Sequence, residues 1–148
     1  MNFDHFNNIG LAAIAISETL AKATNGMTLS KVPLIFPTVM HRQTLSYLSR
    51  KNINISGFTS LFIEHPEFFT NFWRRYEVSL ATSFNAILLL NEIGVTHLEG
   101  RTLSFIRPIT AIDSMGARAQ KISRAASNVE RMLESSPEEL YLNLRIKL

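Results

Sequence analysis

The chain has 148 residues, of which 46% are hydrophobic and 18% charged, no cysteine and a formal net charge of +3. This length predicts one domain over residues 1–148, and the missing cysteines exclude disulfides, thiolate zinc sites and a cysteine nucleophile. Because no apolar run reaches the roughly 18 residues of a membrane span and no Lys or Arg precedes the first apolar segment as in a signal peptide, we expect a soluble, cytoplasmic protein.

The first predicted element is a helix from Asn8 to about Thr24. Asn8 is a plausible N-cap, and Asn25 followed by Gly26 is a usual stop signal. Apolar residues on most sides predict that this helix is buried around most of its circumference; they are Leu11, Ala12, Ile14, Ala15 and Ile16.

The next stretch, "VPLIFPTVMHRQT", covers residues 32–44. Ser30 is a possible cap, and Pro33 is tolerated in a first helical turn, whereas Pro37 lies too deep for an unbroken helix. We therefore expect a kink near Pro37, or a helix that restarts there and runs through "TLSYLSR".

Residues 58–94 predict two or three helices after a short link. Pro66 occupies a first-turn position, and Gly94 ends the last of these helices. We expect much of the core from the aromatic and apolar side chains of this segment, namely Phe58, Leu61, Phe62, Phe68, Phe69, Phe72 and Trp73.

Residues 95–106 predict a β-hairpin, because β-forming residues alternate around Glu99 and Gly100, a two-residue turn signal. One hairpin in an otherwise helical chain indicates a mainly α fold, a small helical domain of winged-helix-like type. In such folds a helix enters the DNA major groove and the hairpin touches the DNA backbone.

The last long helix has the clearest periodicity, with apolar residues at steps of three and four: Ile112, Met115, Ala119, Ile122, Ala126, Val129 and Leu133. This stripe fits either an amphipathic helix on the chain's own core or an intermolecular coiled coil. The short repeat and its two alanines favour the first alternative. After Pro137 we expect one more helical turn or an extended tail.

The excess of positive charge lies entirely after Gly100. Arg101 and Arg107 on the hairpin, with Lys121 and Arg124 on the last helix, are therefore candidates for contact with nucleic-acid phosphate. The helix before the hairpin contains no Lys or Arg from Ser79 onward. Direct base readout by that helix is therefore not expected.

Catalytic motifs are missing. The sequence has no glycine-rich phosphate loop, no pair of histidines at metal-binding spacing and no nucleophile elbow. His41 has no acidic neighbour to orient it as a base. We expect no enzyme activity, metal or cofactor, although spacing alone does not exclude a catalytic triad of distant residues.

Four segments, in this order, carry a resemblance to a known family: "NNIGLAAIAI", "PLIFPTVMHRQT", "SFNAILLLNEIGVTHLEGRTLSF" and "GARAQKISRAASNVERML". The chain resembles the small middle component of bacterial three-component ABC systems, which are grouped with Lamassu-type anti-phage defence. The resemblance implies a non-catalytic accessory or adaptor subunit. Such a subunit works beside an SMC-like ABC ATPase and an effector subunit, often a nuclease, on double-stranded DNA and without a membrane.

This resemblance also bears on the candidate sites. It implies that His41 and Arg42 lie at a subunit contact rather than in an active site, and it makes Ile122 and Val129 of the apolar stripe candidates for partner contact. The alternatives are a free-standing winged-helix DNA-binding regulator, which would need the base-reading helix that this chain lacks, and an unrecognised enzyme.

Overall fold

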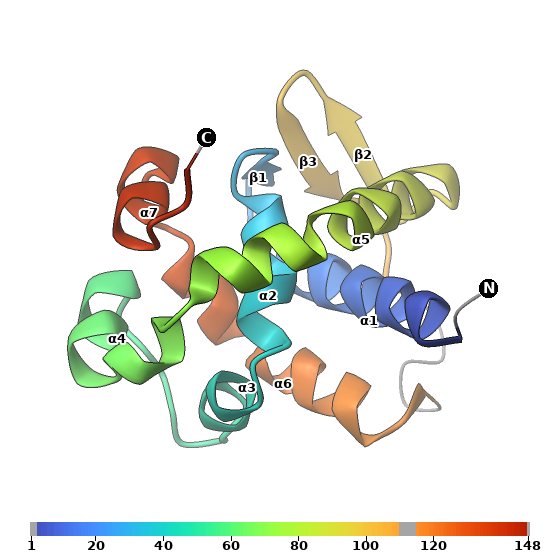
Figure 1. The fold of residues 1–148 in the computed structure, drawn as a ribbon. Coiled ribbons are helices and arrows are strands. Elements are labelled where there is room, and N and C mark those ends of the chain that lie inside the picture. The colour runs from blue at the N-terminus through green and yellow to red at the C-terminus, as the bar shows by residue number, and fades with distance from the viewer. Residues whose placement is uncertain (1–2, 110–114, 148) are drawn as a thin grey trace.

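Helices make up most of the chain in the computed structural model, which describes residues 3–109 and 115–147. The elements are α1 (Phe3–Leu20), β1 (Met27–Thr28), η1 (Val32–Leu34), α2 (Ile35–Val39), α3 (Arg42–Leu48), α4 (Phe58–Glu64), η2 (Pro66–Phe69), α5 (Phe72–Glu92), β2 (Thr96–Glu99), β3 (Thr102–Phe105), α6 (Ala117–Met132) and α7 (Pro137–Asn143) (Figure 1). The fold is mainly α with a small antiparallel sheet and is winged-helix-like, as the sequence predicts.

Helix α1 is the central element of the core. Its side chains from Leu11 to Ser17 are all buried, and it packs against α2, α5 and α6. The predicted burial on most of its circumference is thus confirmed. The predicted N-cap is wrong, because α1 begins at Phe3 and Asn8 lies inside it.

The sheet has three strands in the order β1-β3-β2, all antiparallel. The hairpin of β2 and β3 is confirmed, but Glu99 pairs with Thr102, so the turn is Gly100 and Arg101, one residue later than predicted. Strand β1 was not predicted, because two residues are too few to show an alternation. It pairs with β3 through a close approach at Gly26, where a Cβ atom would lie 2.8 Å from the carbonyl oxygen of Leu103.

The proline-containing stretch forms η1, α2 and α3. Pro33 stands in the first turn of η1, as predicted. Pro37 lies in the first turn of α2, where no intrahelical amide bond is needed, so the helix continues past it. The break falls at His41, whose backbone is extended (φ −81°, ψ 114°), and α3 begins at Arg42.

The guanidinium of Arg75, on α5, holds this break in place. Its Nε donates to the carbonyl oxygen of Pro37 (3.2 Å), while Nη1 and Nη2 donate to those of Thr70 (3.0 Å) and Phe68 (2.8 Å). One side chain thus satisfies carbonyl groups from α2 and from the segment around η2. The bond to Pro37 joins α5 to α2, 38 positions earlier in the chain, and the other two hold the neighbouring segment around η2.

The aromatic residues of α4, η2 and α5 form one side of the core. Phe58, Leu61, Phe68, Phe69 and Phe72 are buried as predicted, Phe62 is half-buried, and the rings of Phe58 and Phe69 lie 5.2 Å apart. Trp73 is the exception, with 38% of its surface exposed. It follows buried Phe72 by one helical position, which turns it about 100° away from the core.

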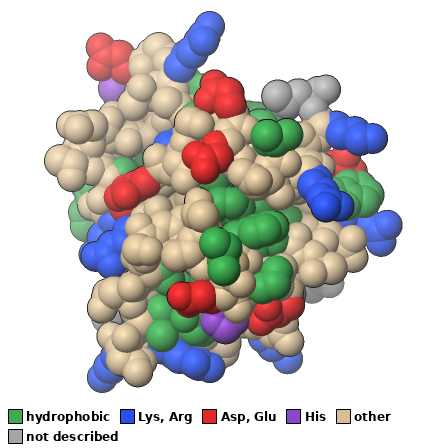
Figure 2. Space-filling model, turned by 90° about the vertical axis from the view of Figure 1, so that its left-hand side faces the viewer, with side chains coloured by type: hydrophobic (Ala, Val, Ile, Leu, Met, Phe, Trp, Pro, Cys, Tyr) green, Lys and Arg blue, Asp and Glu red, His purple; other side chains and the backbone are tan. Residues whose placement is uncertain are grey.

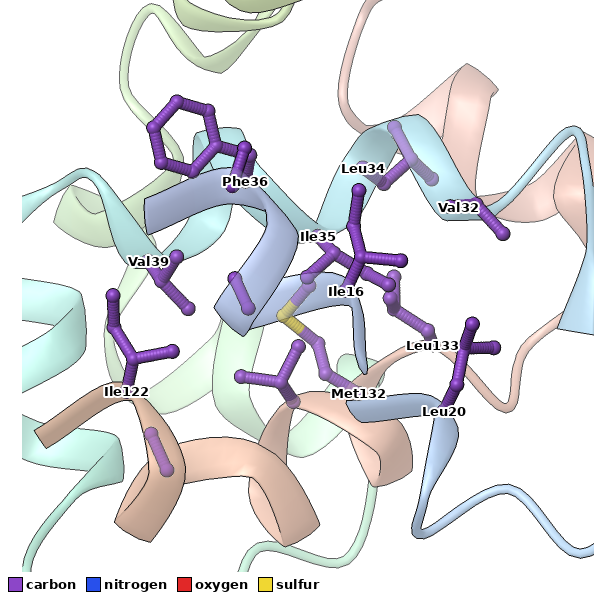
Figure 3. Packing of buried hydrophobic residues seen from close by; sticks show 14 of the residues in the cluster. Ile16, Leu20, Val32, Leu34, Ile35, Phe36, Val39, Ile122, Met132 and Leu133 are labelled. Carbon is purple, nitrogen blue, oxygen red and sulfur yellow. The ribbon is translucent and has the colours of Figure 1, made fainter. Parts of the chain in front are cut away.

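Helix α6 covers the core with its apolar stripe. The stripe residues Ala119, Ile122, Ala126, Val129 and Leu133 are all buried, and Figure 3 shows Ile122 directed toward Val39 of α2. The first alternative, an amphipathic helix on the chain's own core, is therefore confirmed.

The predicted partner contact of Ile122 and Val129 is wrong, because these side chains are 2% and 0% exposed within the chain itself. Met115 lies before α6 and is 47% exposed, so it is not part of the buried stripe. Ile112 lies outside the described residues. After Pro137 the chain is helical, with Ser136 as the N-cap of α7.

Asn128 is a buried polar residue of α6 whose side chain forms hydrogen bonds with the backbone of the link between α3 and α4. This link lacks regular secondary structure, so its backbone groups need other partners. Asn128 Oδ1 accepts from the amide of Ile55 (3.1 Å), and Nδ2 donates to the carbonyl oxygens of Leu48 and Ile53 (both 2.9 Å). The side chain therefore ties the end of α3 and the link to α6.

We expect Asn128→Leu, a change to similar volume, to lower the free energy of unfolding by about 2–4 kcal/mol, because two buried backbone groups and one part-buried group lose their partner. Urea denaturation followed by circular dichroism measures the loss. The matched control is Asn54→Leu in the same link, where the side chain is exposed and the change should stay within about 0.5 kcal/mol. Equal stability of the two variants would contradict this role.

Candidate functional site

Two of the described histidines, His41 and His65, contact one aromatic ring. Among the residues that the structure describes, no cluster of three or more His, Asp or Glu side chains could hold a metal ion. His41 and His65 do meet the same ring: Phe68 stacks on His65 (centroids 4.7 Å apart) and presents an edge contact to His41 (6.5 Å). Sequence patterns do not predict this aromatic cluster, because it depends on η2 packing against α3, where the rings of Phe68 and Tyr47 lie 5.5 Å apart.

His41 occupies the N-cap position of α3. Its Nδ1 lies 2.7 Å from the hydroxyl oxygen of Thr44. Partial burial, and secondarily the positive charge of Arg75, lower the pKa of His41 from its ordinary value. The ring is therefore neutral at physiological pH and helps to hold the break between α2 and α3, while the neighbouring Arg42 is exposed.

The four cations predicted to touch phosphate lie in two separate places. Arg101 is exposed at the tip of the hairpin. Arg107 donates to the carbonyl oxygen of Ile93 at the C-terminal end of α5, where a cation is favoured by the helix dipole. Lys121 and Arg124 are exposed on α6, which Figure 1 shows at the opposite end of the molecule from the hairpin. A DNA duplex could therefore use one of these places without the other.

A pocket of about 500 Å³ lies between α2, α3 and the start of α6. It brings together Arg42, predicted at a partner contact, and Lys121, predicted at phosphate. The sequence prediction missed a third cation there, Arg118, although its spacing of three from Lys121 on one helix was a usable signal. We call this pocket the α3–α6 groove; its lining residues are Val39, Met40, Arg42, Leu45, Ser46, Ala117, Arg118 and Lys121.

The outer side of α5 carries several exposed apolar side chains. Val78, Phe84 and Leu88 are 73%, 47% and 66% exposed, and they fall within about 120° around the helix axis. Apolar side chains that gather on one side of a surface helix are a candidate interaction surface. We call these three residues the α5 surface.

A second group of exposed apolar side chains lies on α4, on α7 and at the start of α5. Figure 2 views this side of the molecule and shows hydrophobic side chains gathered near its middle, with acidic side chains around them. Ile63 of α4 and Leu142 of α7 are 72% and 79% exposed, and Trp73 lines a shallow pocket with Phe62 and Asn143, which neighbour these two residues in sequence. We call Ile63, Trp73 and Leu142 the α4–α7 surface.

None of the described helices combines the length and the apolarity that a bilayer crossing requires.

A family model described as "ABC-three component (ABC-3C) system Middle Component 3" matches residues 11–148. Neither the curated proteins nor the solved structures contain a match to the chain.

We expect the stabilising role of His41 to depend on pH. Its pKa is lowered in the folded state, so the unfolded chain, with a pKa near 6.5, binds the proton more readily. The contribution of His41 to stability is then complete above pH 6.5 and falls as the pH drops through that value toward the folded-state pKa. His41→Gln removes this titration.

Urea unfolding at several pH values between 7.5 and 5 tests this expectation. As the pH falls, the unfolding free energy of the unmodified chain should decrease relative to that of His41→Gln. His97→Gln, on exposed strand β2, controls for the loss of a histidine as such. A difference that stays constant across this range would show that position 41 does not titrate in this way.

Proposed function

Since this chain belongs to the family of ABC-three component system middle component 3, we propose that it is a non-catalytic adaptor subunit of an anti-phage complex of Lamassu type. In this proposal it joins an SMC-like ABC ATPase to an effector subunit, often a nuclease. The complex, rather than the isolated chain, acts on double-stranded DNA.

The observation that carries the proposal is the presence of two separate apolar surfaces on one small domain. An adaptor needs a contact area for each of two partners. The α5 surface and the α4–α7 surface supply two such areas. Along α5, Val78 and Leu88 lie five and 15 positions beyond Trp73, about 8 and 22 Å along the helix axis, and Ile63 and Leu142 lie on two other helices, α4 and α7. Both surfaces consist of side chains that favour burial at a protein interface.

The alternative of a free-standing DNA-binding regulator has less support. In a winged-helix domain the helix before the hairpin should present donors and positive charge to the major groove. Here that helix is α5, whose outer side carries the α5 surface and the exposed carboxylates Glu77 and Glu92. Apolar and acidic groups disfavour contact with the bases and with the phosphates.

We expect substitutions on the two surfaces to separate the two partners. Phe84→Asp with Leu88→Asp should weaken binding of one subunit at least about tenfold and leave the other bound, because interface contacts of this size are often dominated by a few apolar anchors. Ile63→Asp with Leu142→Asp should have the converse effect. All four side chains are exposed, so the fold should persist.

The measurement is co-purification of the tagged chain with the ATPase and effector subunits encoded beside it. Thr59→Asp with Ser127→Asp adds the same charge at exposed polar positions and should retain both partners. Retention of both partners by both surface variants would count against the adaptor proposal, as would sequence-selective DNA binding by the chain alone.

A further inference from the structure

The described lining of the α3–α6 groove carries positive charges and no negative charge. Arg42, Arg118 and Lys121 are all exposed around it, and no acidic residue occurs among the described residues that line it. Three cations gathered without an anion repel one another. This arrangement favours a ligand that brings negative charge.

The start of α6 adds to this imbalance. The N-cap Gly116 has no side chain to offer, and the first turn of the described helix contains no acidic residue. Amides of a first helical turn have no partner further back in the helix, and this end of the helix dipole is positive. Arg118 therefore stands where a carboxylate would normally be favoured.

The floor of the groove is apolar. Val39 and Leu45 are buried beneath it, and Met40 and Ala117 complete the carbon lining. A volume of about 500 Å³ accommodates one large side chain and its flanking backbone. Nucleic-acid phosphate would use the cations but leave this floor unfilled, whereas an amphipathic peptide would use both.

We propose that the α3–α6 groove binds an acidic segment of a partner subunit, with an apolar side chain of the segment on Val39, Met40 and Leu45 and its carboxylates facing Arg42, Arg118 and Lys121. This inference rests on the proposed adaptor function, because it assigns one contact of that adaptor. Neither the α5 surface nor the α4–α7 surface shares a residue with this groove.

The probes are fluorescein-labelled 15-residue peptides that tile the ATPase and effector subunits encoded beside the chain, with binding measured by fluorescence anisotropy. We expect one or a few overlapping peptides to bind, each with several acidic residues around an apolar one. Binding should weaken with salt.

Two variants test the groove in different ways. The triple variant Arg42→Glu, Arg118→Glu, Lys121→Glu should weaken peptide binding by about tenfold or more. Ser46→Trp, at an exposed lining position, should block the groove without a change of charge. The control variant Lys22→Glu, Lys51→Glu, Lys147→Glu has the same change of net charge at exposed sites elsewhere and should bind as the unmodified chain does. Circular dichroism confirms that each variant is folded.

Four outcomes would overturn the inference. In the first, no peptide binds. In the second, peptides bind equally well to both groove variants. In the third, the unmodified chain binds a 30-base-pair DNA duplex but none of the peptides, and the triple variant binds the duplex more weakly. This outcome would identify a nucleic-acid site. In the fourth, sedimentation shows self-association that the triple variant abolishes, which would identify a second copy as the occupant. Co-purification of both subunits in any of these cases would leave the adaptor function standing while the groove inference fails.

Discussion

The burial of α1 from Leu11 to Ser17 is the constraint on which the other elements depend. A helix segment that is apolar on most of its circumference must be covered on most of it, and α2, α5 and α6 supply most of this cover. Ala12 and Ala15, both fully buried, leave little side-chain bulk and so let the neighbouring helices approach closely. Because α5 and α6 each give one side to α1, their other sides remain available for contacts outside the chain.

Two polar side chains fix the elements that border these outer surfaces. Asn128 ties the end of α3 to α6, the two helices that flank the α3–α6 groove. Arg75 ties the end of α2 and the segment around η2 to α5. The groove and the α5 surface therefore lie on helices that are held by specific hydrogen bonds as well as by apolar packing. Such support keeps the relative positions of binding groups constant.

Local patterns predicted the local structure and failed where distant residues decide. The stripe of α6, the hairpin and the stop at Gly94 follow from spacing and turn chemistry. The sequence predicts the break near Pro37 rather than at His41. No local signal shows that the guanidinium of Arg75 donates a hydrogen bond to the carbonyl oxygen of Pro37. Arg42 and Lys121 were assigned to different roles for the same reason: only the packing of α3 against α6 puts them in one groove.

The position of α1 in the chain has a consequence for synthesis. Helix α1 emerges from the ribosome before α5 and well before α6, yet both are needed to cover it. During synthesis its apolar circumference stays exposed until the last third of the chain has been made. Contacts between segments so far apart form slowly, and exposed apolar segments of this kind invite aggregation. Production of this domain should therefore depend on chaperones and on the rate of translation more than its small size suggests.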